Sequence, residues 1–217
     1  MELQGKVVNF LGDSITEGVG VSSPDKLYHQ LIKRRVGLAE ARIYGVSGSR
    51  YARQLVVTSE RSDRDFCMRA EEMDPSADIV IVFGGTNDFG HGTAPIGTFE
   101  DREPTTFYGA AHWLYSFLKR TYPSAVIAIC TPTHRRNECC TKGDIKPYHC
   151  GTLKRYVDII REVAEYYSLP VIDLFAMSGI QPAIDEQRER YMPDGLHPND
   201  AGHEILAERI ANFLLAY

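Results

Sequence analysis

The sequence has few of the features that mark membrane, secreted or nucleic-acid-binding proteins. No apolar run approaches the roughly 20 residues that span a bilayer, and the net charge of −5 lacks the basic excess of a nucleic-acid-binding protein. The five cysteines are an odd number without framework spacing, which indicates reduced thiols. The N-terminus carries no basic stretch, and its apolar run 7–11 is too short for a signal peptide. We therefore expect a cytoplasmic protein with no membrane span and no nucleic-acid partner.

Motifs for metals and nucleotides are also missing. In the segment 134–150, which contains histidines and cysteines, Cys139 and Cys140 are adjacent and no C-x-x-C pair occurs, so zinc binding is disfavoured. The segment Gly12–Thr16 lacks the lysine and glycine spacing of a phosphate-binding loop, and no G-x-G-x-x-G follows the first apolar run. A G-x-S-x-G elbow is absent as well, which argues against the α/β-hydrolase fold. We expect no metal and no cofactor.

What the sequence does contain is a regular alternation of short apolar segments and amphipathic stretches. At 217 residues it can build one sizeable core, and we expect a single domain over residues 1–217. Strands are predicted at 7–11, 41–44, 79–83, 126–130 and 171–174. Helices are predicted at 107–118, 153–167, from 199 or 200 to the end, and in shorter patterns at 28–35 and 62–73. This alternation predicts an α/β protein whose parallel sheet carries helices on both faces.

Each of four distinctive polar or glycine-rich segments follows a predicted strand. They are Gly12–Thr16, Gly45–Gly48, Gly84–Asp88 and Asp194–Asn199. Because the carboxyl ends of parallel strands lie at one edge of the sheet, we expect these segments to meet there, where ligands bind. Two long connections, 86–105 and 131–152, should lie at the same edge. The first of them is interpreted either as a mobile lid or as a fixed wall of the pocket.

The residue types in these segments suit acyl transfer. Ser14 is predicted to be the nucleophile and His197 the base that removes its proton, since a serine hydroxyl is a poor nucleophile without one. Asp194 is predicted to orient the imidazole, with Gly195 allowing the tight turn between them. For the oxyanion, the candidate donors are the backbone N–H groups of Ser14 and Gly48 and the side-chain amide of Asn87.

Neighbouring residues offer alternatives for several of these roles. Asp173, at the end of the fifth predicted strand, is the second candidate for the acid. We expect Asp13 to brace the nucleophile loop through backbone hydrogen bonds, and His203 to face solvent on the last helix. Asn87 could instead cap a turn with Asp88, whereas a left-handed conformation at Gly48 is compatible with its role as a donor.

Taken together, these blocks resemble the SGNH hydrolases, also called GDSL-type esterases. The matching blocks are Gly-Asp-Ser-Ile-Thr at 12–16, the Ser-Gly at 47–48, Gly-Thr-Asn-Asp at 85–88 and Asp-x-x-His-Pro at 194–198, in the family's order. The resemblance runs from residue 6 to about residue 215 and implies a flavodoxin-like, three-layer αβα sandwich with a five-stranded parallel sheet. It also implies that Ser14, Gly48, Asn87 and His197 take the roles that give the family its letters, with Asp194 as the acid. One departure is Ile43, where many members have asparagine.

The expected activity is hydrolysis of a small-molecule acyl ester through an acyl-enzyme. Polar loops without a long apolar stretch favour a small acyl group, such as acetyl, on a polar carrier such as a carbohydrate. Their charged or titratable side chains are Arg50, Arg53, His91, Arg102, His134, Arg135, Arg136 and Lys142. A lysophospholipase or thioesterase of the same family is the alternative, and a flavodoxin-like module that binds a small anion without turnover is a second one. The sequence does not predict an oligomeric state.

Overall fold

The computed structural model describes residues 1–217 and contains one five-stranded sheet in which every pairing is parallel. The strand order is β2-β1-β3-β4-β5, which confirms the predicted α/β fold class. The strands are β1 Val7–Gly12, β2 Glu40–Gly45, β3 Ile79–Phe83, β4 Val126–Cys130 and β5 Val171–Ile172. All five residues of the central strand β3 are buried, which accounts for its uninterrupted apolar sequence.

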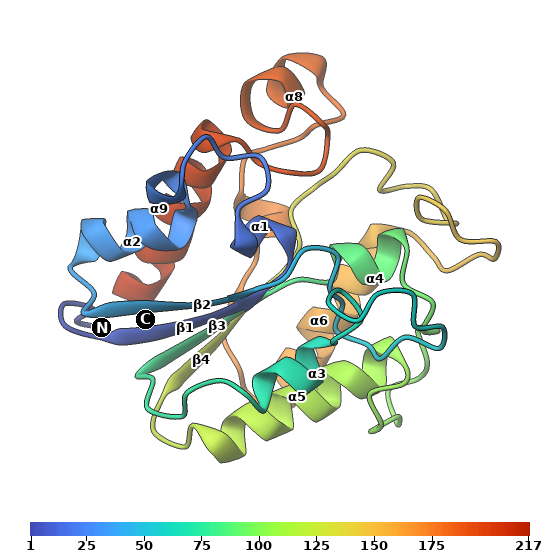
Figure 1. Cartoon of the computed structure of the whole chain (residues 1–217), viewed down its shortest axis with the longest axis horizontal. Helices are drawn as coiled ribbons and strands as arrows, with labels where there is room; N and C mark the ends of the chain where they lie inside the picture. The colour runs from blue at the N-terminus through green and yellow to red at the C-terminus, as the bar shows by residue number, and fades with distance from the viewer.

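Helices cover both faces of this sheet (Figure 1). On one face lie α2 (Tyr28–Val36) and α9 (Asp200–Ala216), and on the other α3 (Phe66–Ala70), α5 (Phe107–Thr121) and α6 (Leu153–Tyr166). Each face encloses its own apolar core, formed by the alternating side chains of the strands and the apolar stripes of the helices. Caps fix where two of the long helices, α5 and α9, begin: Thr106 Oγ1 accepts from Gly109 N at 3.0 Å, and Asn199 Oδ1 accepts from Gly202 N at 3.1 Å.

Several short elements complete the chain: α1 Ser14–Glu17, the 3₁₀ helix η1 Pro24–Lys26, α4 Thr86–Gly90, α7 Leu174–Met177 and α8 Asp185–Tyr191. The predicted loop 86–105 therefore begins with a helix. Its remainder is tied to neighbouring backbone, since Arg53 N donates to Pro104 O at 2.7 Å and Phe107 N to Pro95 O at 2.9 Å. These bonds favour a fixed wall over a mobile lid. No helix combines the length and hydropathy that crossing a membrane requires.

Three sequence predictions differ from the structure. Strand β5 ends at Ile172 because the Asp173 carboxylate caps α7, accepting from Ala176 N at 3.3 Å. The predicted helix 62–73 is limited to α3, because Asp65 caps it by accepting from Met68 N at 2.8 Å. The expectation of a solvent-facing His203 is wrong. This ring is fully buried, and its Nδ1 accepts from Tyr28 N at 3.1 Å, where α2 has no side-chain cap of its own.

Candidate functional site

Ser14 is the first residue of α1, a single helical turn that follows directly from strand β1. Asp13 caps this turn by accepting from Ile15 N at 3.0 Å, which is the bracing expected of it. The backbone N–H of Ser14 lies in the first turn, where no intrahelical acceptor exists. The residue is only 4% exposed, so its hydroxyl is largely shielded from solvent at the edge of the sheet.

A row of hydrogen bonds joins Ser14 to the segment before α9. Ser14 Oγ lies 3.0 Å from His197 Nε2, and His197 Nδ1 lies 2.6 Å from Asp194 Oδ2. The other carboxylate oxygen accepts from the backbone N–H groups of Leu196 at 2.8 Å and His197 at 2.7 Å. Partial burial opposes ionisation of Asp194, but these hydrogen bonds outweigh it and lower its pKa. The carboxylate thus fixes both the ring and the turn that carries it.

The turn from Asp194 to His197 depends on Gly195, whose φ of +80° is in the left-handed region. Behind it, Arg136 N donates to Gly195 O at 2.7 Å and links this turn to the connection after β4. A second link comes from the loop after α1, where Ser22 N and Oγ donate to the Asp200 carboxylate at 2.8 and 2.6 Å. The segments that carry the serine and the histidine are therefore attached to each other directly.

The position of α1 depends on the absence of a side chain at Gly45. A Cβ at this residue would lie 2.5 Å from Glu17 N and 2.7 Å from Thr16 C, both backbone atoms of α1. In the parallel register Gly45 pairs with Gly12, so α1 crosses the ends of strands β1 and β2 at close range. The glycine after β2 thus lets the serine-bearing turn pack against the sheet edge.

The other two predicted donors follow the neighbouring strands. Gly48 comes three residues after β2 and has a φ of +76°, while Asn87 lies in the first turn of α4, directly after β3. One amide hydrogen of Asn87 is donated to Ser49 O at 3.1 Å, and its Oδ1 faces His91 Nε2 at 3.1 Å. An asparagine amide has two N–H groups, so the second is left for a ligand.

Two buried carboxylates frame this edge. Burial raises the pKa of both Asp13 and Asp88 to about 6. The Asp88 carboxylate accepts from Tyr51 N and Ala52 N, each at 3.0 Å, and so holds the chain after Ser49 against α4. Asp88 therefore fixes the backbone that Asn87 contacts.

The remaining candidates lie in other environments. Asp173 accepts from Arg161 Nη2 at 2.7 Å and from Thr131 Oγ1 at 3.0 Å, and no histidine is among its partners. In the segment considered for zinc, His134 pairs with Glu138 at 2.9 Å, and no group of three or more potential ligands is placed to hold a metal. Cys139 and Cys140 are exposed thiols.

Arg50 and His91, two of the polar loop residues named from the sequence, make contacts inside the protein. Arg50 is 5% exposed and forms an ion pair with Asp63 beneath the loop surface. His91 is half-buried beside it. Neither contact has a sequence signal, because Arg50 and Asp63 are 13 positions apart, Arg50 and His91 are 41 positions apart, and the loops that carry them contain no motif.

The fold and the row Ser14–His197–Asp194 define a class: hydrolases in which a histidine oriented by a carboxylate faces a serine at the edge of an α/β sheet. The chain belongs to the GDSL-like Lipase/Acylhydrolase family, whose model matches residues 10–205. This membership makes the protein a hydrolase of the acylhydrolase type and confirms the resemblance inferred from the four blocks.

Solved structures agree with this placement. A protein from Lactobacillus plantarum is 28% identical, with a TM-score of 0.83 over 99% of this chain and 98% of that one. The acetyl xylan esterase AlAXEase is 20% identical, with a TM-score of 0.64 over 95% and 98% of the two chains. A carbohydrate acetylesterase family member from Sinorhizobium meliloti is 14% identical, with a TM-score of 0.65 over 97% and 98%. At these last two identities the likeness concerns the fold. No curated protein matches the sequence.

Proposed function

We propose that this protein is a serine ester hydrolase that works through an acyl-enzyme. The observation that carries the proposal is the continuous row from Ser14 Oγ through both ring nitrogens of His197 to Asp194, with separations of 3.0 and 2.6 Å. Such a row lets one residue accept a proton from the hydroxyl while another stabilises the resulting imidazolium.

The reaction follows from this geometry. Ser14 Oγ attacks the ester carbonyl as His197 Nε2 takes its proton, and the carbonyl oxygen becomes an oxyanion. Collapse of the tetrahedral intermediate expels the alcohol, which receives that proton from His197. Water then attacks the acyl-enzyme, with His197 again the base, and releases the carboxylic acid and free Ser14. Asp194 remains ionised throughout.

The oxyanion donors in this proposal are the N–H groups of Ser14 and Gly48 and the free amide hydrogen of Asn87. They come from the ends of β1, β2 and β3, which the register brings to one level of the sheet edge. Loss of one such donor typically lowers kcat by about 10²–10³.

Hydrolysis of p-nitrophenyl acetate by the wild type and by Ser14→Ala tests the activity. We expect the variant to lose nearly all turnover, because water lacks a positioned nucleophile, and a fluorophosphonate probe to label the wild type only. Ser178→Ala, at a buried serine outside the row, is the matched control and should keep both activity and labelling. Near-equal rates in a folded Ser14→Ala protein would exclude the proposal. Stable binding of small anions without labelling would favour the binding-module alternative.

For the substrate we propose a short acyl group, such as acetyl, on a polar carrier such as a carbohydrate. The loops after the strands carry charged or titratable side chains, such as His91, His134 and Arg136, and no long apolar stretch, which favours a short acyl group over a long acyl chain. Two structural relatives are described as an acetyl xylan esterase and a carbohydrate acetylesterase family member. A series of p-nitrophenyl esters from acetyl to decanoyl tests this. We expect the highest kcat/KM at two to four carbons, and a maximum at eight or more would indicate a lysophospholipase-like enzyme instead.

A further inference from the structure

A buried polar chain leads from the loop after β2 to the amide of Asn87. Its first member, Asp63, pairs with Arg50, and both side chains are almost inaccessible to solvent. Arg50 Nη1 lies 2.9 Å from His91 Nδ1, and His91 Nε2 lies 3.1 Å from Asn87 Oδ1. The chain thus ends on one of the proposed oxyanion donors.

Arg50 determines which ring nitrogen of His91 carries the proton. A guanidinium can only donate, so Nδ1 must accept. Burial, and then the charge of Arg50, lower the pKa of His91 to about 4, so the ring is neutral at pH 7 and has a single N–H. That hydrogen is therefore on Nε2 and points at Asn87 Oδ1.

The same bond determines which way the Asn87 amide faces. With Oδ1 accepting from His91, the amide nitrogen donates one hydrogen to Ser49 O at 3.1 Å and keeps the other free. A flip of the amide would place two donors against each other at His91 and two acceptors at Ser49. It would also put an oxygen where the oxyanion needs a donor.

We propose that His91 and Arg50 are positioning residues that hold the Asn87 amide with its free hydrogen toward the oxyanion. This assignment rests on the proposed oxyanion role of Asn87. Neither residue touches the reacting atoms; they act through the amide. Asp63 anchors the far end, since it also accepts from Ser59 N at 2.7 Å and so fixes the loop that holds Arg50.

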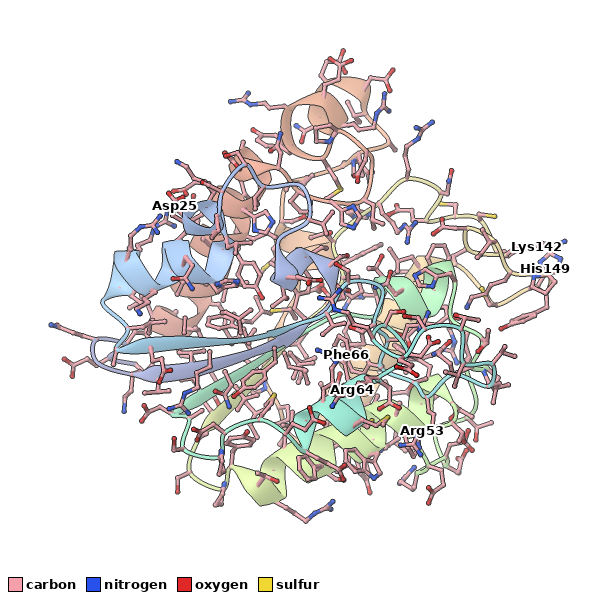
Figure 2. The ribbon with its side chains drawn as sticks, viewed as in Figure 1. Asp25, Arg53, Arg64, Phe66, Lys142 and His149 are labelled. Carbon is pink, nitrogen blue, oxygen red and sulfur yellow. The ribbon has the colours of Figure 1, made fainter.

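A double-mutant cycle tests the assignment. We expect His91→Phe to lower kcat by about tenfold with KM nearly unchanged, because one donor is misplaced but not removed. His91→Gln should recover most of kcat, since a glutamine amide can accept from Arg50 and donate to Asn87. In an Asn87→Ala background, His91→Phe should cause no further loss. The matched control is His149→Phe, at an exposed ring in the connection that follows β4 (Figure 2). This variant should leave kcat unchanged.

An equal loss of kcat from His91→Phe in both backgrounds, or no loss at all, would overturn the proposal. A second readout does not depend on activity: ¹⁵N spectra of the histidine rings in the wild type, with the His91 signal assigned by its absence in His91→Gln. We expect the neutral Nε2–H tautomer at pH 7, and the Nδ1–H form or a charged ring would overturn the assignment even if the protein proved not to be an esterase. If Ser14→Ala retained activity while this tautomer was found, the proposed function would fail and the hydrogen-bond chain would stand.

Discussion

Replacement of Asp194 by asparagine reverses the polarity of one hydrogen bond while keeping the shape of the side chain. In the folded protein Asp194 Oδ2 accepts from His197 Nδ1 at 2.6 Å, so Nε2 can accept from Ser14 Oγ at 3.0 Å. In Asp194→Asn an amide N–H faces Nδ1, which must then accept. The ring proton moves to Nε2 and points at Ser14, and this tautomer cannot take the serine proton.

The magnitude follows from the exposure of the carboxylate. Loss of the correct tautomer costs about 10⁴ in kcat where the acid is buried. The Asp194 side chain is 53% exposed, so water can replace part of its interaction with the ring. We therefore expect kcat to fall by about 10³, or about 4 kcal/mol of transition-state stabilisation. The asparagine Oδ1 can still accept from Leu196 N and His197 N, so the turn should stay folded.

The assay is the steady-state rate on p-nitrophenyl acetate, normalised to folded protein by circular dichroism and thermal melting. Asp173→Asn is the matched control, because that carboxylate binds Arg161 and caps α7 without contact to a histidine. It should lower stability and leave kcat near the wild-type value. A loss of less than tenfold in Asp194→Asn, or an equal loss in Asp173→Asn, would refute the assigned role.

Two further predictions concern stability. In Gly45→Ala the new Cβ would meet the α1 backbone at 2.5 Å. We therefore expect the free energy of unfolding in urea to fall by about 1–3 kcal/mol, and kcat to fall by about 10² as Ser14 shifts. Gly5→Ala, at a positive φ with open space around it, should lower stability without lowering kcat. Burial raises the pKa of Asp13 to about 6, so the folded state binds more protons than the unfolded state between about pH 4 and 6, and stability falls as pH rises through this window. Asp13→Asn should lack this dependence. Its free energy of unfolding in urea, relative to that of the wild type, should therefore rise by about 1 kcal/mol from pH 5 to pH 7.5. If the stability difference between the two proteins were the same at both pH values, the burial argument would be contradicted.

The fold was predictable because its signals are local. Continuous apolar runs in β3 and β4 require cover on both faces, and that cover comes from the amphipathic stripes of α5, α6 and α9. The errors arose where one side chain decides the backbone. Asp173 ends β5 by capping a helix, and His203 is buried because it takes an N–H of Tyr28 more than 170 residues away. No periodicity of hydrophobic residues contains such information.

The candidate site was predictable to the extent that short segments repeat a known pattern. Ser14, Asp194 and His197 stand in blocks whose order alone brings them to one sheet edge, and the structure connects them. The support of Asn87 was not predictable. Arg50 and His91 are ordinary polar residues of a loop, and only the folded chain shows that the first is buried and that the second faces the amide.

The groups around Ser14 are held by different contacts, and this has a kinetic consequence. The nucleophile is placed by the close approach of α1 to Gly45, the base by its own carboxylate and the link from Ser22 to Asp200, and the amide by His91. Because the base support and the amide support share no hydrogen bond, damage to one of these two should leave the other in place. Variants of the base support should shift the pH dependence of kcat, whereas variants of the amide support should lower kcat at every pH. The kinetic effect of a variant should therefore depend on which of these contacts it removes and not on its distance from Ser14.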